Sequence, residues 1–286
     1  MVPLSESEDL FMDAITRFDR REIKYVLHER QAAAVRAAIS GRLLRDPHAG
    51  PRGRYPVISI YLDNAARDTY REHLLALPSR RKVRIRVYGR AGDHPHGLTF
   101  MEIKHKQAER TGKRRIALDL AEALDLAQGL PLGRQLEGMD ATTLEELQGL
   151  IAEKQLRPTC IVRYEREAWT GQAGEADLRL TIDSGLRARA RDFTHVIPDD
   201  RDFGAQLLPA DLRVLEVKVD LTVPAWLSDQ LEALGCRPRA CSKYQLAVES
   251  LGLQPSASGI DVASGWAPTN GAPSRQCCSK AGAGVG

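Results

Sequence analysis

The sequence has no strong excess of charge of either sign and few aromatic residues. Its net charge is only +3, because 41 basic residues are balanced by 38 acidic ones. This balance disfavours a duplex-DNA-binding protein, whose surface would carry one dominant sign. Aromatic residues make up 5% of the chain, and the tyrosines form no interleaved stacking face, which disfavours a single-stranded RNA-binding module. We therefore expect no nucleic-acid partner.

The chain also lacks the sequence signals of secretion, membrane insertion and zinc binding. Its five cysteines show neither CxxC pairs nor zinc-finger spacing, and their odd number favours reduced thiols. The opening residues MVPLSESEDLF contain no basic stretch followed by an apolar run, and no stretch of about 18 apolar residues occurs. We expect a soluble, cytoplasmic protein with no membrane insertion.

What the chain does have is a charge pattern repeated on short apolar segments. In RREIKY, KVRIRVYG, FMEIKHK and VLEVKVD, charged residues recur at every second position. Residues two apart on a strand share a face, so each segment predicts a strand with one charged and one apolar face. One such strand alone would be read as the solvated face of a sheet. Several together favour a sheet curled around a cationic cavity that also holds a few carboxylates.

Hydrophobic periodicity predicts an α+β fold. Eight segments are predicted as strands, near 20–28, 55–63, 82–90, 98–106, 113–119, 158–168, 177–187 and 212–220. Helical spacing predicts helices at 29–45, 65–77, 119–129, 141–155, 225–234 and 242–251. The loops at 91–97 and 169–176 are typical of hairpin connections. Strands joined in this way favour an eight-stranded antiparallel β-barrel over a βαβ arrangement.

The predicted domain organisation has three parts. Residues 1–16 form an N-terminal segment, and residues 17–253 form one domain that contains every predicted strand. Residues 254–286 are rich in Gly, Ser, Pro and Ala and are predicted to be a flexible C-terminal tail. With 286 residues and 43% hydrophobic content, the chain can bury a substantial core.

The charged residues of the predicted strands are candidate ligands of a polyanion and a metal ion. Forked guanidinium groups, such as those of Arg84 and Arg86 on one strand face, match phosphate oxygens. The other basic candidates on strands are Lys104, Lys106, Arg166, Arg179 and Lys218. Glu22, Glu102 and Glu216 each precede a lysine by two residues. Such carboxylates either hold the lysines in ion pairs or bind Mg²⁺ or Mn²⁺.

Lys243 is a candidate for a different reason. It follows Ser242, a predicted helix N-cap, and therefore lies in the first helical turn, where the helix dipole disfavours a cation. Helix stability therefore gives no reason for a lysine at this position. We expect it to point toward a bound phosphate chain.

Nine short motifs carry a resemblance to a known family. RREIKY, SIYLDN, KVRIRVYG, FMEIKHK, KRRIAL, YEREAW, LRLTID, VLEVK and SKY occur in this order between residues 17 and 250. With them, the chain resembles the polyphosphate polymerase domain of vacuolar transporter chaperone (VTC) proteins, which belongs to the triphosphate tunnel metalloenzyme superfamily. The resemblance implies an eight-stranded antiparallel β-tunnel with helices packed outside. Its basic lumen would hold ATP and a growing polyphosphate beside Mn²⁺ or Mg²⁺.

The resemblance also implies roles for individual residues. The phosphate ligands would be Lys24, Arg84, Arg86, Lys104, Arg166, Arg179, Lys218 and Lys243, with Lys106 as a further candidate. The four arginines would neutralise the reacting phosphate, and Glu216 would bind the metal, with Glu22 and Glu102 as further candidates. The superfamily's first strand has two glutamates before its lysine, whereas this chain has Arg20 and Glu22. This departure fits the polymerase branch and disfavours simple triphosphatase activity.

Three functions stay open at this stage. The leading prediction is a polyphosphate polymerase that transfers the γ-phosphate of ATP to a growing polyphosphate. The second is a metal-dependent phosphohydrolase that cleaves triphosphate or ATP. The third is a non-catalytic module that binds polyphosphate or inositol phosphates. Glu216 disfavours this last function, because anion binding alone needs no metal ligand.

Overall fold

The computed structural model describes residues 21–49, 52–88, 98–108, 110–172, 174, 177–194, 196 and 203–255. The predicted N-terminal segment, Arg20, the loop at 91–97 and the predicted tail beyond Pro255 lie outside these residues. Among the described helices, none combines the length and the apolar character needed to cross a membrane.

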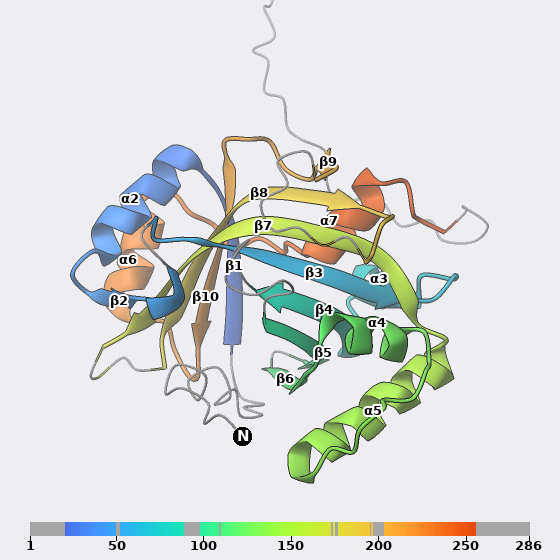
Figure 1. Ribbon diagram of the computed structural model, residues 1–286. Helices are drawn as coiled ribbons and strands as arrows, with labels where there is room; N and C mark the ends of the chain where they lie inside the picture. Colours follow the sequence, from blue (N-terminus) through green and yellow to red (C-terminus); the bar gives the residue numbers. More distant parts are fainter. Residues whose placement is uncertain are drawn as a thin grey trace, which may run out of the picture. The chain divides into compact units, whose positions relative to one another are not determined.

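One antiparallel sheet organises the described residues (Figure 1). Eight strands pair along a single path in the order β1, β10, β8, β7, β3, β4, β5, β6. Along the chain these are β1 (Arg21–His28), β3 (Tyr55–Asp63), β4 (Ser79–Tyr88), β5 (Leu98–Gln107), β6 (Arg110–Ala117), β7 (Arg157–Gly171), β8 (Arg179–Arg189) and β10 (Leu212–Val219). Two short strands lie off the path: β2 (Leu43–Arg45) pairs with β7, and β9 (Ala205–Gln206) pairs with β8.

The two ends of this path approach each other without a backbone ladder. Residues of β1 and β6 lie close together, yet no strand pairing joins them in the described part of the chain. On the neighbouring strand β5, Lys104 Nζ lies 2.7 Å from Glu22 Oε2 of β1. The predicted antiparallel sheet with helices is confirmed. The predicted closed barrel is not, because the sheet curls until side chains, rather than backbone hydrogen bonds, connect its edges.

The helices are α2 (Glu29–Ile39), α3 (Asp68–Leu74), α4 (Leu120–Ala127), α5 (Gly138–Lys154), α6 (Ala225–Ala233) and α7 (Lys243–Ser250), with a short 3₁₀ turn η1 (Pro47–Ala49). The predicted helix at 29–45 is too long. Gly41 adopts φ +77° just after α2, a conformation that favours glycine and ends the helix. Residues 43–45 then form β2 on the edge of β7.

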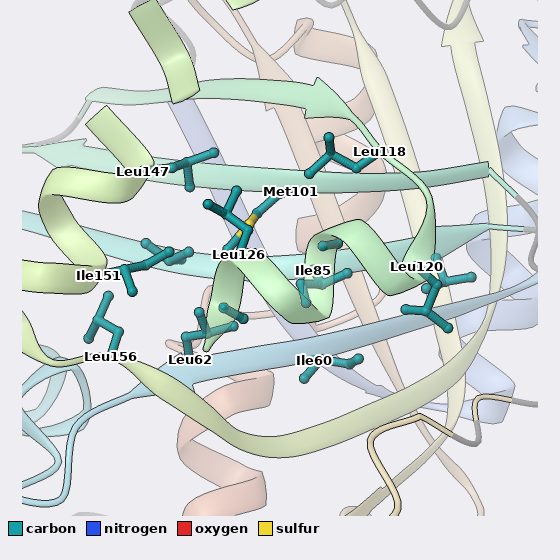
Figure 2. Close-up of a cluster of buried hydrophobic side chains, with 14 of the residues drawn as sticks. Ile60, Leu62, Ile85, Met101, Leu118, Leu120, Leu126, Leu147, Ile151 and Leu156 are labelled. Atoms are coloured by element: carbon teal, nitrogen blue, oxygen red, sulfur yellow. The ribbon is translucent and has the colours of Figure 1, made fainter. Parts of the chain in front are cut away.

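Most helices cover the apolar face of the sheet. Figure 2 shows Leu126 of α4 and Ile151 of α5 packed over Ile60, Ile85 and Met101 of the central strands. Burying an aliphatic side chain of this size stabilises the fold by about 1.5–3 kcal/mol. A second apolar cluster, around Leu180, Leu215 and Val217, lies under α2 and α6.

Helix α7 and its neighbour α3 depart from the predicted arrangement with helices outside. Tyr244 and Ala247 of α7 and Tyr70 of α3 belong to an apolar cluster with Val57, Tyr61 and Tyr164. These three strand residues lie in the same alternating register as the charged residues. Helix α7 therefore packs on the face opposite to α4 and α5, which the sequence pattern could not indicate.

Candidate functional site

The strand register places most of the predicted site residues on one face of the sheet. Lys24 lies opposite Glu216, and Arg84 lies opposite Glu102. Arg166 lies opposite Asp183. We call this surface the charged face and define it by Glu22, Lys24, Lys82, Arg84, Arg86, Glu102, Lys104, Lys113, Arg115, Arg166, Arg179, Asp183, Glu216 and Lys218 of the strands, with Lys243 of α7. Cations clearly outnumber carboxylates on it.

Glu216 is the most heavily surrounded carboxylate of the charged face. Its oxygens lie 3.2 Å from Lys243 Nζ, 3.5 Å from Lys218 Nζ, 3.7 Å from Lys24 Nζ and 4.0 Å from Arg166 Nη2. Burial alone would raise the pKa of Glu216, but these four cations hold it well below its usual range. Glu216 is therefore an anion at neutral pH. Through its cations it links β1, β7 and α7 to its own strand, β10.

Asp183 holds a second pair of cations. It accepts two hydrogen bonds from Arg166, Nε to Oδ1 at 2.7 Å and Nη2 to Oδ2 at 2.8 Å. Lys243 Nζ lies 2.7 Å from the same Oδ2. Since Asp183 is fully buried, this forked contact fixes the guanidinium plane of Arg166 and leaves its Nη1 on the side away from the carboxylate. Lys243 therefore lies among the strand residues of the charged face, and its predicted contact with a phosphate chain stays a prediction.

Arg84 and Arg86 differ in their partners although they share a strand face. Arg84 Nε donates to Glu102 Oε2 at 2.8 Å, and its Nη2 lies 2.6 Å from the same oxygen. Arg86 instead donates to two hydroxyls, Ser59 Oγ at 3.2 Å and Tyr88 OH at 3.3 Å. Arg86 is 4% exposed, and it has no ion pair with a carboxylate of any described residue.

Glu22 joins two of the predicted phosphate-binding lysines. Its Oε1 lies 3.1 Å from Lys24 Nζ, and its Oε2 lies 2.7 Å from Lys104 Nζ. Burial opposes ionisation of Glu22, but these lysines hold its pKa well below the usual range. Lys24 Nζ also donates to the backbone oxygen of Cys241 at 3.1 Å. Both lysines are therefore held in place before any ligand binds.

Two predicted residues lie farther from these buried contacts. The Arg179 side chain is 40% exposed, and its Nη2 lies 3.4 Å from Asp46 Oδ2. Lys106 lies one step beyond Lys104 on the same face of β5, is partly exposed, and makes no ion pair with another described residue. Their roles stay predictions.

Three buried side-chain donors in the register of the charged face have no hydrogen-bond partner among the described residues. They are Arg86 Nε, Tyr164 OH and Thr181 Oγ1. Buried donors and acceptors are rarely left without partners, because each such group costs about 1–3 kcal/mol. The charged face therefore retains hydrogen-bonding capacity for a bound anion.

Lys82, Lys113, Arg115 and Asp183 of the charged face, and Tyr88 beside it, were not among the site residues predicted from the sequence. Lys82 precedes Arg84 by two residues in KVRIRVYG, so the same alternation that identified Arg84 could have identified it. Tyr88 ends the same row and accepts from Arg86. Burial would raise the pKa of Tyr88, but Arg86 and Lys113 lower it to about 8.

The carboxylates of the charged face fit a metal ion that arrives with a phosphate ligand better than an ion held by the protein alone. Within the described ranges, no three His, Cys, Asp or Glu side chains form a group that could hold a metal ion. The predicted metal ligands Glu22 and Glu216 are joined through Lys24, whose Nζ contacts both, while Glu102 is engaged by Arg84. Mg²⁺ in phosphate sites commonly uses one or two carboxylates and takes its other ligands from phosphates and water.

The chain matches the sequence model of one protein family and is similar to several solved structures. A sequence model of the VTC domain matches residues 19–252, and no curated protein matches the chain.

The similar structures include a protein of Pyrococcus horikoshii OT3, 13% identical over 80% of this chain and 98% of that one, with a TM-score of 0.43. A candidate adenylate cyclase of Bacillus halodurans is 12% identical over 79% and 95%, with a TM-score of 0.45. The Mimivirus capping enzyme triphosphatase is 8% identical over 80% and 92%, with a TM-score of 0.29. TM-scores this low assign no activity to the chain.

Proposed function

This chain belongs to the VTC domain family, and from that premise we propose that it is a polyphosphate polymerase. It transfers the γ-phosphate of ATP to the end of a growing inorganic polyphosphate that lies along the charged face. The curled sheet, with its two edges close together, would enclose this polymer as a tunnel. The free thiols of Cys160, Cys236 and Cys241 support a reducing, cytoplasmic location.

The environment of Arg86 is the observation that carries this proposal. The side chain is almost fully buried. Among the described residues its hydrogen-bond partners are hydroxyl groups only, and its Nε has no partner. A buried guanidinium without a carboxylate is costly unless an anion completes its contacts. A phosphoryl group, with its several equatorial oxygens, matches the fork of Arg86 and the nearby Tyr164 hydroxyl.

The two neighbouring arginines are prepared for the same ligand in another way. Glu102 holds Arg84, and Asp183 holds Arg166, each through Nε and Nη2. These contacts fix the guanidinium planes before the ligand arrives, so less conformational entropy is lost on binding. Their remaining donors would neutralise non-bridging oxygens of the transferred phosphate, which is the main source of catalysis in phosphoryl transfer.

The reaction itself needs no covalent participation by the protein. A terminal oxygen of the polyphosphate, or of orthophosphate as the primer, forms a new bond to the γ-phosphorus of ATP. The bond from that phosphorus to the β,γ-bridging oxygen breaks, and ADP leaves with the electron pair. Lys24, Lys104, Lys218 and Lys243 would hold the polymer by its negative charge, and Arg179 would act at the more exposed part of the face.

A divalent metal ion would be held by Glu216, with Glu22 on the adjacent strand. When bound, Mg²⁺ or Mn²⁺ supplies charge neutralisation to the phosphate oxygens. The cations around Glu216 keep it ionised and thus able to act as a ligand. Glu102 is engaged by Arg84 and serves to position that arginine.

Product analysis tests this function. The purified chain is incubated with ATP and Mn²⁺, with orthophosphate as primer, and the products are sized on a gel. Phosphate chains longer than triphosphate support a polymerase. Release of orthophosphate without chain growth would replace it by a phosphohydrolase, and triphosphate binding without turnover would replace it by a non-catalytic binding module.

A further inference from the structure

Lys82 differs from the other lysines on the charged face in its polar partner. Its Nζ donates to Ser242 Oγ at 3.3 Å, and no carboxylate of a described residue lies within ion-pair distance of it. By contrast, Lys24, Lys104 and Lys243 each contact at least one carboxylate. Lys82 is thus a lysine of the charged face whose hydrogen-bond acceptor, among the described residues, is a neutral hydroxyl.

The groups nearest to Lys82 are mostly cationic. Lys104 lies directly opposite it on β5, and like charges at such a position repel each other. Lys24 on β1 and Arg80 on β4 add to this repulsion. His73, at the end of α3, is neutral, because burial and the neighbouring cations, Lys82 first, lower its pKa to about 3.

The carboxylate and the aromatic ring near Lys82 are already engaged with each other. Asp63 attracts Lys82 only weakly. It accepts hydrogen bonds from the Tyr244 hydroxyl at 2.6 Å and from the backbone amides of Thr69 and Tyr70. The Tyr244 ring lies 5.8 Å from Lys82 Nζ. An external anion would therefore satisfy Lys82 better than any group around it.

We propose that Lys82 is a further phosphate-binding residue and that it takes up a proton from solvent when a triphosphate or polyphosphate occupies the charged face. This inference rests on the function proposed above and adds a residue and a linked proton to it. The step converts the neutral amine to an ammonium ion, which then donates to a phosphoryl oxygen. No other bond forms or breaks.

The titration of Lys82 supports the same inference. Burial, followed by repulsion from Lys24, Lys104 and Arg80, lowers the pKa of Lys82 to about 7. Near neutral pH, a large fraction of the side chain is thus neutral before binding. A bound polyanion adds negative charge next to it and raises its pKa, so binding draws a proton from the buffer.

Calorimetry with inorganic triphosphate tests the linked proton. Binding is measured at pH 7.5 in two buffers of different ionisation enthalpy, for the wild type and for Lys82→Arg, which keeps a permanent charge. The wild type is expected to take up about 0.5–1 proton more than Lys82→Arg. Lys218, whose pKa burial lowers to about 8, and the triphosphate itself titrate in both proteins and cancel in the difference.

Affinity measurements test the contact itself. Lys82→Met is expected to bind triphosphate about tenfold more weakly at pH 6.5, where the lost group is charged, and the deficit should shrink at pH 8.5. The matched control is Arg81→Met, on the same strand but turned toward Glu146 of α5.

Equal proton uptake by the wild type and Lys82→Arg would overturn the inference. So would a Lys82→Met variant that binds within twofold of the control at both pH values. A wild type that binds no triphosphate would instead refute the function on which the inference rests. Thermal unfolding of Lys82→Arg confirms that the comparison is made between folded proteins.

Discussion

Lys104 and Glu22 form a 2.7 Å ion pair although β1 is the first strand of the sheet's pairing path and β5 is the second from its other end. The two side chains are 31% and 7% exposed, so the contact is largely shielded from solvent. In the described residues, no backbone ladder joins β1 to β6. The pair therefore connects edges that strand pairing leaves separate.

Neutralising Glu22 should destabilise the fold. In Glu22→Gln, Lys104 and Lys24 lose a shared anion in a mostly buried environment, and the free energy of unfolding should fall by about 1–3 kcal/mol in urea titrations. Asp192→Asn is the control, because Asp192 pairs with Arg191 on the exposed surface and should change stability by less than about 0.5 kcal/mol. Equal losses in the two variants would show that the pair is not important for stability.

Asp183 should matter more, since it holds two buried cations. Asp183→Asn leaves Arg166 and Lys243 with weakened partners, and we expect a loss of about 3–5 kcal/mol in the free energy of unfolding. The double variant Asp183→Asn/Arg166→Met also removes the guanidinium that has lost its carboxylate partner, and it should recover part of this loss. A double variant no more stable than the single one would contradict this explanation.

The pH dependence of stability at the acid end should depend on Glu216. Its pKa is lower in the folded protein than in the unfolded chain, so its stabilising contribution is complete above the unfolded pKa of about 4.3 and is lost as pH falls through the folded pKa. Between those two values, Glu216→Gln should reduce the slope of unfolding free energy against pH by up to about 1.4 kcal/mol per pH unit. Urea titrations from pH 5 to pH 3 measure this slope for the wild type and for Glu216→Gln. Parallel curves for the two proteins would disprove the role of Glu216 in acid stability.

Lys82 should also make stability rise with pH, but in the neutral to alkaline range. Its folded pKa of about 7 is below the unfolded value of about 10.4. Between these values the unfolded chain binds more protons, so this residue makes stability rise with pH. Lys82→Met removes a partly buried charge among cations and should raise the melting temperature at pH 7 by about 2–4 °C for each kcal/mol gained. The gain should shrink toward pH 10, and a variant less stable than the wild type at pH 7 would refute the account.

Arg86 should be sensitive to the shape of its side chain as well as to its charge. Arg86→Ala removes a guanidinium that would donate hydrogen bonds to the equatorial oxygens of the transferred phosphate. This loss should lower the rate of polyphosphate synthesis by about 10²–10³-fold. Arg86→Lys keeps the charge but lacks the fork, and an intermediate loss is expected. Arg114→Ala is the matched control, because Arg114 lies on the other face of the sheet and contacts Glu146. A rate unchanged in Arg86→Ala would remove Arg86 from the site.

The sequence was sufficient to locate the strands and most of the charged face. Alternation of charged and apolar residues is a local property, so the predicted strand at 55–63 matches β3 and the strand at 212–220 matches β10 to within one residue. The same alternation correctly placed Arg84 and Glu102 on one face.

Long-range features could not be predicted in this way. The pairing of Arg166 with Asp183 depends on the register between β7 and β8, which no local pattern encodes. The position of α7 on the charged face depends on Tyr244, whose apolar partners come from distant strands. Helical periodicity likewise extended the predicted helix through Arg45, because apolar residues such as Leu43 fit either a helix or the three-residue strand β2.

The contact between β5 and β1 has a consequence for ligand binding. Separating β1 from β6 breaks no strand ladder in the part of the chain that is described, only side-chain contacts such as that of Lys104 with Glu22. An anion that competes with Glu22 for Lys104 weakens this contact between β1 and β5. Occupancy of the site and the spacing of the two strands are then reciprocally coupled, each shifting the equilibrium of the other.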